Sequence, residues 1–321
     1  MSQKDLESNI TKRPPSLWHH LRKQLNWPLT EFGGHLLLPD VPLGPGGTKT
    51  QGLRMEALSS PHIWTDLKDF NVGQDFGEER NGRIIGGYVP PAHTIRYIVS
   101  IRRIGGDHFC GGSLVGTLWV LTAAHCNIGY DGFEIVAGEH NLTEYEGTEQ
   151  YLYPELLIPH PNYNSATNNH DLMLIKLQSP AILGSFVSIV VLPHQDASIH
   201  EGHMCRVSGW GYTNFAEKQA SIVLRTVNIP IISPVECNGS SSFNGHITSK
   251  MLCAGYNDGG KDACKGDSGG PLVCEGRVYG IVSWGKSCGE AHYPGVYTAV
   301  AQFRTWIDEA MQILSHTCPM V

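Results

Sequence analysis

Short apolar runs separated by Gly, Pro and Asn make up most of the chain after Tyr97. They are four to seven residues long and rich in Val, Ile and Leu. Many short strands at such spacing indicate an all-β domain of barrels or sandwiches. We predict a first set of strands at residues 98–101, 112–115, 119–122, 134–137 and 172–177, and a second set at 204–210, 226–231, 271–274, 277–283 and 295–298.

The two ends of the chain depart from this pattern. Residues 1–83 have scattered Pro and Gly, no cysteine and no sustained period, so we expect a largely disordered pro-segment with at most a short helix at 61–70. The alternative is a tail without function. Near the other end, apolar residues at helical spacing predict one terminal helix. These residues are Val300, Phe303, Trp306, Ile307, Ala310, Met311 and Leu314.

The distribution of charge limits the classes of partner. The 321 residues carry a formal net charge of −7. Residues 1–83 hold ten basic and ten acidic side chains, whereas residues 84–321 hold 13 and 20 and carry the whole excess. Such a domain lacks the basic face that phosphate binding needs, so we expect no nucleic-acid partner. No stretch reaches the ~20 apolar residues of a membrane helix, so we expect no membrane association.

The nine cysteines all follow residue 109 and indicate an oxidising compartment. None forms a CxxC or Cys/His zinc pattern, so we interpret them as the disulfide framework of a secreted, extracellular protein. The polar start at residues 1–7 contains no signal peptide, and the apolar residues 36–38 are too few for one. We give the cysteines more weight and expect a natural N-terminus other than Met1.

A glycine-rich run at residues 262–271 contains the candidate nucleophile, Ser268. A serine hydroxyl is a poor nucleophile unless a base and an oxyanion site stand beside it. Gly266, Gly269 and Gly270 permit strained backbone conformations. Such a backbone can direct the N–H groups of Gly266 and Ser268 toward a developing oxyanion. Taken alone, the run is also compatible with an ordinary tight turn.

Two motifs upstream supply the partners that Ser268 needs. His125, in Ala-Ala-His-Cys, is a candidate base, and Asp171, at the edge of an apolar strand, is a candidate carboxylate. The order His, Asp, Ser is that of chymotrypsin and differs from the orders in subtilisin and the α/β-hydrolases. Over residues 84 to about 312, the chain therefore resembles trypsin-type serine proteases of the chymotrypsin family.

The resemblance implies a fold and a disulfide pattern. It implies an all-β protease domain at residues 84–321, with two six-stranded antiparallel β-barrels, an active site in the cleft between them and a C-terminal helix. The first barrel would span about residues 84–195, and the second barrel with the helix about 196–314. The implied disulfides are Cys110–Cys126, Cys205–Cys274, Cys237–Cys253 and Cys264–Cys288, with Cys318 left over.

The resemblance also implies a mechanism of peptide hydrolysis. His125 would take the Ser268 proton and return it to the leaving amine, while Asp171 would hold the imidazole tautomer. The N–H groups of Gly266 and Ser268 would form the oxyanion hole. His170 precedes Asp171 where the family usually has Asn or Thr. Catalysis would need no cofactor, and a monomer would bind protein or peptide substrates and protein protease inhibitors.

Specificity is expected to depend on Asp262, which matches the residue at the bottom of the trypsin S1 pocket. A desolvated carboxylate there selects Arg or Lys, because an apolar side chain would leave the charge unpaired. The alternative is a surface residue in a loop. The other substrate-binding residues that the resemblance implies are Ser283, Trp284, Gly285 and Gly295, with Lys265 at the pocket rim and Ser287 where a Gly is usual.

Activation is expected by cleavage between Arg83 and Ile84. In the family, the new amino group of the Ile inserts into the body and pairs with the Asp before the nucleophile, here Asp267. A buried ion pair of this kind adds little net stability, but losing one partner is costly, so it suits a switch.

Residues 139–149 resemble the trypsin calcium loop. The resemblance implies side-chain ligands from Glu139 and Glu149 and backbone carbonyl ligands from Asn141 and Glu144, with Glu146 acting through water. Calcium prefers about 6–8 oxygen ligands, carboxylates among them. The alternative is an acidic, solvated loop.

Taken together, these features predict a secreted zymogen of a calcium-stabilised serine endopeptidase that cleaves after Arg or Lys. Short loops around the cleft favour broad specificity over that of a kallikrein-type or coagulation-type regulatory protease. The alternative from another class is a catalytically inactive homologue that acts as a binding protein. Such homologues usually lack a triad residue, whereas this chain has His125, Asp171 and Ser268.

Overall fold

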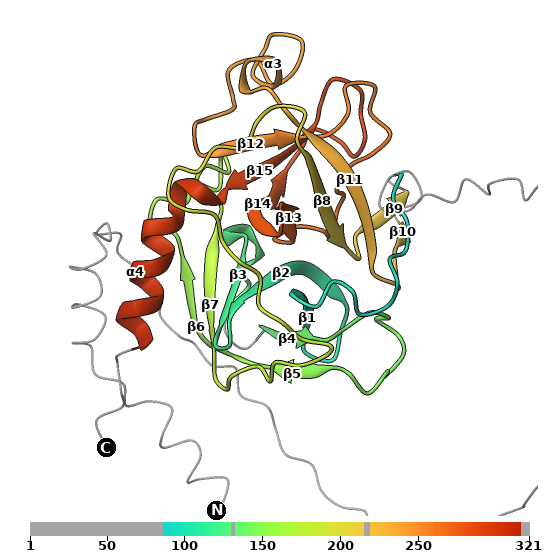
Figure 1. Ribbon diagram of the computed structural model, residues 1–321, viewed down its shortest axis with the longest axis vertical. Helices are drawn as coiled ribbons and strands as arrows, with labels where there is room; N and C mark the ends of the chain where they lie inside the picture. Colours follow the sequence, from blue (N-terminus) through green and yellow to red (C-terminus); the bar gives the residue numbers. More distant parts are fainter. Residues whose placement is uncertain (1–85, 130–131, 215–218, 316–321) are drawn as a thin grey trace, which may run out of the picture. The chain divides into compact units, whose positions relative to one another are not determined.

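The computed structural model describes residues 86–129, 132–214 and 219–315. The expectations for the pro-segment 1–83, for Arg83 and Ile84, and for Cys318 lie outside the described residues. Within them, every strand predicted from the apolar runs is present, and the structure is mostly β (Figure 1). None of the described helices is both long and apolar enough to cross a membrane.

The first sheet is antiparallel and barrel-like, and it has seven strands where six were expected. The extra strand arises because residues 150–159 form two strands with Tyr153 between them: β5 pairs with β4, and β6 pairs with β7. Pro154, which fixes its own φ and has no N–H to donate, begins the second of them. The strands are β1 (Ile98–Arg103), β2 (His108–Gly116), β3 (Trp119–Thr122), β4 (Phe133–Ala137), β5 (Gln150–Leu152), β6 (Pro154–Pro159) and β7 (Met173–Leu177), in the order β5-β4-β1-β2-β3-β7-β6.

The second sheet is a closed six-stranded barrel, as expected. Next to it lies a two-stranded ribbon of β9 (Tyr212–Asn214) and β10 (Gln219–Ala220), which the sequence did not predict. The barrel strands are β8 (Met204–Gly209), β11 (Arg225–Ile232), β12 (Met251–Ala254), β13 (Pro271–Cys274), β14 (Arg277–Trp284) and β15 (Gly295–Ala299), in the order β11-β12-β15-β14-β13-β8.

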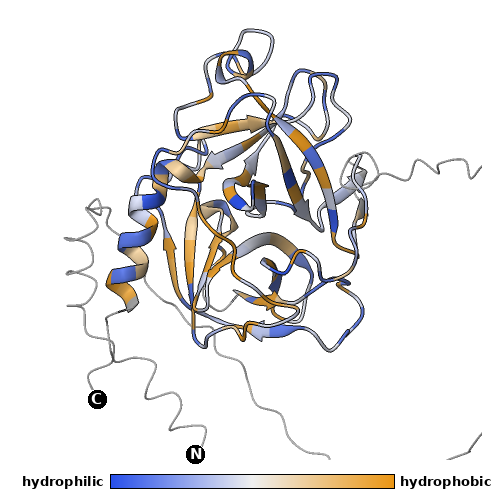
Figure 2. Ribbon diagram, viewed as in Figure 1, coloured by the Kyte–Doolittle hydropathy of each residue, from blue (hydrophilic) through white to orange (hydrophobic). Residues whose placement is uncertain are grey.

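The helices are short until the C-terminus. Those within the described residues are η1 (Ala124–Cys126), α3 (Pro234–Cys237), η3 (Val300–Phe303) and α4 (Arg304–Ser315). Helix α4 follows the last strand of the second barrel but packs along β6 and β7 of the first sheet (Figure 1). Its buried residues Ile307, Ala310 and Leu314 share one core with Leu157 and Leu174 of those strands. Figure 2 shows the matching division of α4 into an apolar and a polar side. The helix therefore connects the two sheets through a shared core.

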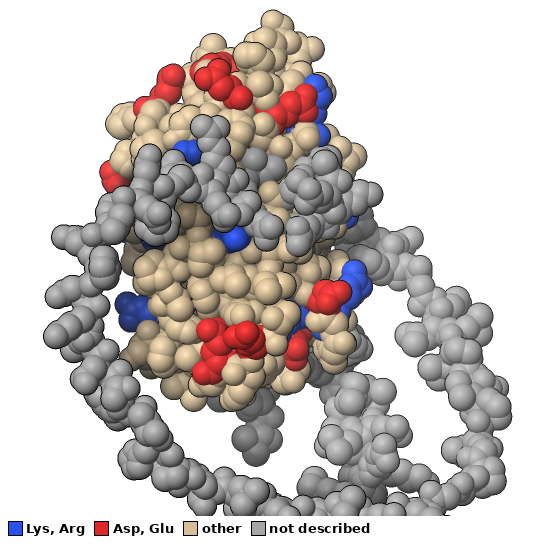
Figure 3. All heavy atoms as spheres, turned by 90° about the vertical axis from the view of Figure 1, so that its right-hand side faces the viewer, with Lys and Arg blue, Asp and Glu red and all other residues tan. Residues whose placement is uncertain are grey.

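Disulfides cross-link the segments that carry two of the predicted catalytic residues, His125 and Ser268. The structure contains the same four pairs that the resemblance implied. Cys110–Cys126 joins β2 to the short helix η1, and Cys264–Cys288 joins the loops on either side of β13 and β14. On the face drawn in Figure 3, acidic side chains gather in several clusters, in keeping with the net negative charge of residues 84–321.

Candidate active site

The predicted triad residues lie at the ends of strands. His125 is in η1 directly after β3, Asp171 precedes β7, and Ser268 precedes β13. The first two belong to the first sheet and the third to the second, so the triad forms only where the sheets meet. The backbone confirms this proximity, because Gly111 N–H of β2 donates to the Ser268 carbonyl at 2.8 Å.

His125 and Asp171 form a two-point contact. The His125 ring Nδ1 lies 2.7 Å from Asp171 Oδ2, and the His125 backbone N–H donates to Oδ1 at 3.0 Å. Because a carboxylate only accepts, the ring proton lies on Nδ1, and Nε2 is free to accept a proton. This tautomer is the one a general base beside Ser268 needs.

The Asp171 carboxylate is fully buried, with 0% exposure, and its hydrogen bonds come from both sheets. Ser283 Oγ of β14 donates to Oδ2 at 2.5 Å, and Thr298 Oγ1 of β15 donates to the Asp171 backbone carbonyl at 2.7 Å. A buried carboxylate is tolerated only when such donors replace its water. Ser283, predicted to line the cleft near Asp171, thus also fixes the Asp171 carboxylate.

His170, the departure from the family pattern, adopts a left-handed backbone with φ of 57°. Asn tolerates this conformation better than most residues, which explains why the family often has Asn here. In this chain the His170 ring stacks on His160 at 4.9 Å and meets Phe303 edge-on at 5.5 Å. These ring contacts offset part of the backbone strain at His170 and fix the position of the residue directly before Asp171.

Gly266 and Ser268, the predicted oxyanion donors, lie on one tight turn. Gly266 has φ of +100°, and a Cβ there would lie 2.9 Å from Gly211 Cα, so no other residue fits without strain. Among the described residues, neither the Gly266 N–H nor the Ser268 N–H has a hydrogen-bond partner. Two unpaired donors on one turn are what a developing oxyanion would bind. No hydrogen bond joins Ser268 Oγ to the His125 ring among the described residues, where the ring's bond is to Asp171. The contact between nucleophile and base is often long before substrate binds.

Asp267, predicted to pair with the Ile84 amino group, is completely buried. The N–H groups of Gly211 and Cys264 each donate to its carboxylate at 2.8 Å. Burial raises its pKa to about 6, and these two donors act in the opposite direction. Ile84 lies outside the described residues, so the ion pair remains a prediction.

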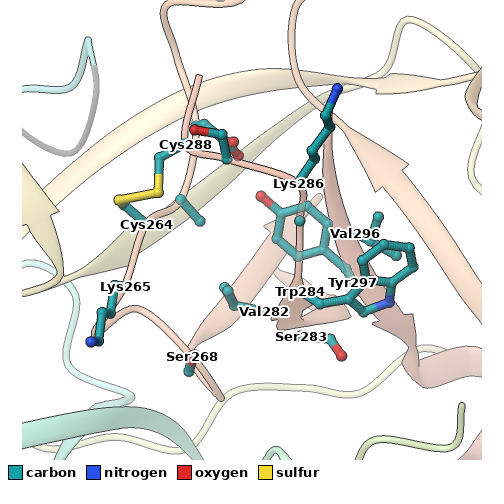
Figure 4. A pocket seen from close by; sticks show the side chains of 15 residues that line it. Cys264, Lys265, Ser268, Val282, Ser283, Trp284, Lys286, Cys288, Val296 and Tyr297 are labelled. Carbon is teal, nitrogen blue, oxygen red and sulfur yellow. A yellow bond between two sulfur atoms is a disulfide. The ribbon is translucent and has the colours of Figure 1, made fainter. Parts of the chain in front are cut away.

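A pocket with a volume of about 180 Å³ opens beside Ser268 (Figure 4). Ser268 and Ser283 lie on one side of it, the Cys264–Cys288 disulfide lies on another, and Tyr297 lies between them. The predicted residues Asp262, Ser283, Trp284, Gly285 and Gly295 all line this pocket, as do Lys265, Lys286 and Ser287.

Asp262 is the one acidic residue that lines the pocket, and it is buried. Its Oδ2 accepts the Gly289 N–H at 3.0 Å, whereas Oδ1 has no partner within the described residues. Burial raises the pKa of Asp262 to about 7, while the N–H groups of Gly289 and Ala263 lower it. A Cβ on Gly295 would lie 2.7 Å from Oδ1, so a larger residue there would block this oxygen.

Trp284, which lines the pocket, belongs to a cluster of aromatic rings. Trp284 meets Phe243 edge-on at 5.0 Å, and Phe243 meets Tyr293 at 5.6 Å. Lys286 lies 3.7 Å from the centre of the Tyr293 ring. Figure 4 shows the amino groups of Lys265 and Lys286 pointing away from the pocket on opposite sides. The sequence did not predict that Lys286 would line it.

The acidic loop brings three of its carboxylates together. Oxygens of Glu139, Glu146 and Glu149 lie within 4.8 Å of one another, so Glu146 belongs to the cluster directly. Glu139 is buried, and its Oε1 has no partner in the described part of the chain. Three converging carboxylates and a free buried oxygen fit the donor set that calcium prefers. Asn141 and Glu144 also lie on this loop, and the Asn141 carbonyl accepts the Glu144 N–H at 3.2 Å.

We expect Asp171→Asn to slow the reaction of Ser268 with a fluorophosphonate by about three to four orders of magnitude. The Asn amide can donate to Nδ1, which would place the imidazole proton on Nε2 and prevent it from accepting the Ser268 proton. Labelling rates are compared by mass spectrometry with those of Asp258→Asn, an exposed matched control. Equal rates in both variants would show that Asp171 does not activate Ser268.

Comparison with known proteins agrees with this geometry. The family model described as Trypsin matches residues 84–307. The chain is 45% identical to Trypsin-3 of Salmo salar over 234 residues, which cover 73% of this chain and 95% of that protein. It is 43% identical to Trypsin of Sus scrofa over 236 residues, which cover 74% and 99% respectively. Serine protease 1 of Rattus norvegicus is 44% identical over 236 residues, which cover 74% and 93%.

The matched region contains both sheets, the pocket and all three predicted triad residues. The chain therefore belongs to the trypsin family of the chymotrypsin-type serine proteases and is a serine endopeptidase that acts on protein substrates.

Proposed function

We propose that this endopeptidase cleaves after Arg or Lys, and that it is a secreted zymogen activated between Arg83 and Ile84. The observation that carries the specificity is the free Oδ1 of Asp262 in the pocket beside Ser268. A guanidinium or ammonium group supplies both the charge and the donor that this buried oxygen lacks. An apolar side chain would leave the carboxylate desolvated and unpaired.

The inactive-homologue alternative is less consistent with the site. His125 and Asp171 have the tautomer and contacts of a general base, and the N–H groups of Gly266 and Ser268 are unpaired. A protein that only bound partners would not need this combination of groups. We therefore assign catalytic roles to His125, Asp171 and Ser268, with Gly266 and Ser268 as the oxyanion donors.

The first test is hydrolysis of Arg, Lys and Phe amide substrates by the uncut chain and by chain cleaved after Arg83. We expect activity on Arg and Lys only after cleavage. Asp262→Asn should lower kcat/KM on Arg by about 100-fold or more, because the charge-assisted contact is lost. Asp258→Asn, which changes an exposed carboxylate, is the control.

The other outcomes separate the parts of this proposal. Activity on Phe would contradict the Asp262 pocket while keeping the protease. Full activity of the uncut chain would contradict the zymogen. No activity from cleaved, disulfide-intact protein would favour the binding protein.

The raised pKa of Asp262 predicts a pH dependence of cation binding. Only the carboxylate form attracts a cation, so benzamidine affinity should fall about tenfold per pH unit below about 7 and level off above it. Benzamidine affinity is measured by calorimetry, because turnover would also depend on His125. Asp262→Asn should bind benzamidine weakly and with no such slope. A wild-type affinity that stays constant from pH 5 to 8 would contradict the assignment.

Activation is proposed to act through Asp267. Its buried carboxylate has two backbone donors but no cation among the described residues. The Ile84 amino group, freed by cleavage, would supply that charge. Because Asp267 lies between the two oxyanion donors, pairing it would stabilise the turn on which both N–H groups lie.

We also propose that calcium binds the loop at 139–149, through the Glu139 and Glu149 carboxylates and the Asn141 and Glu144 carbonyls, with Glu146 nearby. Calcium would neutralise carboxylates that lie within 4.8 Å of one another. We expect millimolar calcium to raise Tm by several degrees and magnesium to have a smaller effect, as measured by calorimetry. Glu149→Gln should abolish the shift, and Glu201→Gln, an exposed change elsewhere, should keep it. Identical Tm values with and without calcium would contradict the site.

A further inference from the structure

A line of polar contacts runs from the acidic loop to the oxyanion turn. Glu139 forms an ion pair with the guanidinium of Arg102 on β1. Arg102 Nε lies 3.4 Å from Ser100 Oγ, which lies 2.8 Å from His108 Nδ1. His108 Nε2 lies 2.9 Å from the Gly266 carbonyl oxygen. The sequence did not predict a connection between the acidic loop and the oxyanion turn.

The direction of the hydrogen bonds in this line follows from its two ends and from a neutral His108. The Gly266 carbonyl can only accept, so His108 carries a proton on Nε2. Because burial lowers the pKa of His108 to about 4, the ring is neutral at pH 7 and Nδ1 accepts. The Ser100 hydroxyl then donates to Nδ1, and its oxygen accepts from Arg102, which can only donate.

The surroundings keep that imidazole neutral and the line dry. Ser100 is fully buried, and the side chains of Glu139 and Arg102 are 2% and 14% exposed. The pKa of His108 is lowered to about 4, chiefly by burial; the hydrogen bond to the Gly266 carbonyl acts in the opposite direction, and the Arg102 charge adds to the lowering. In such surroundings hydrogen bonds polarise one another, so the loss of one donor weakens the next bond in the line.

The Gly266 turn needs external support. Its φ of +100° lies in a region where glycine moves freely, and its N–H has no protein partner among the described residues. Two contacts hold the peptide groups on either side: Tyr212 N–H donates to the Lys265 carbonyl at 2.7 Å, and His108 donates to the Gly266 carbonyl. The second of these contacts is the end of the line that starts at Glu139.

We propose that Arg102 is a positioning residue: anchored by Glu139, it orients Ser100 and His108 so that the Gly266 N–H stays directed at the oxyanion. The proposal rests on the oxyanion role assigned to Gly266 above. It makes the order of the acidic loop a determinant of catalytic rate, through side chains that never touch substrate.

The test is Arg102→Met, with Arg103→Met as the matched control, because Arg103 is an exposed arginine on the same strand. Removing an oxyanion donor outright costs about 10²–10³ in kcat, and a loosened donor should cost less. We therefore expect Arg102→Met to lower kcat about tenfold with KM within about twofold. Affinity for a peptide aldehyde, whose adduct with Ser268 places an oxyanion at Gly266, should fall by a similar factor. Benzamidine, which reaches only the Asp262 pocket, should bind as before.

A second variant separates positioning from charge compensation, because Arg102→Met leaves Glu139 buried without its cation. In Arg102→Met/Glu139→Gln that charge is removed, so Tm measured in EDTA, where the calcium loop contributes nothing in any variant, should recover, whereas kcat and aldehyde affinity in the same buffer should remain low. Recovery of kcat with Tm, or unchanged kcat and aldehyde affinity in both variants, would overturn the proposal. The substrate is the one that the wild type cleaves fastest, so failure of the Arg and Lys specificity would leave this test intact.

Discussion

The buried carboxylate of Asp171 is the constraint on which the site depends. Asp171 lies just before β7 of the first sheet, yet its carboxylate accepts a hydrogen bond from Ser283 Oγ of the second sheet. Its backbone carbonyl accepts another from Thr298 Oγ1, also of the second sheet. Leaving a buried charge without donors is costly, so the two sheets must meet in the one arrangement that satisfies it. The same contact orients His125. The hydrogen bonds of Asp171 therefore both join the two sheets and orient the imidazole of His125.

The triad residues could be predicted because each of them lies in a short sequence motif. The order of His125, Asp171 and Ser268 is a motif, and the strands around them are continuous apolar runs. The two strands within residues 150–159 were not predicted, because the Pro residues at both ends of β6 look like turn signals. A proline is compatible with a strand at its ends or at a sheet edge, which only the pairing reveals.

The contacts among Arg102, Ser100, His108 and Gly266 could not be predicted from spacing. His108 and Gly266 are 158 residues apart, and neither Ser100 nor Arg102 belongs to a motif. Their relation follows from strand geometry: Arg102 lies opposite His108 in the β1–β2 pair, next to an irregularity in register. Polar residues on adjacent strands are neighbours only once register is set, so a sequence pattern cannot identify them.

The buried carboxylates of this domain differ in how their charge is compensated, and that difference matches the roles proposed for them. Glu139 has a resident cation in Arg102, so it can anchor a network without a ligand. Asp262 accepts the Gly289 N–H at Oδ2 but has a free Oδ1, and burial raises its pKa to about 7, so its charge is only partly compensated until a cation binds. A carboxylate that is stable alone would gain little from a substrate side chain. Under the proposed specificity, the incomplete compensation of Asp262 would allow the pocket to discriminate, since an Arg or Lys side chain would supply the missing partner.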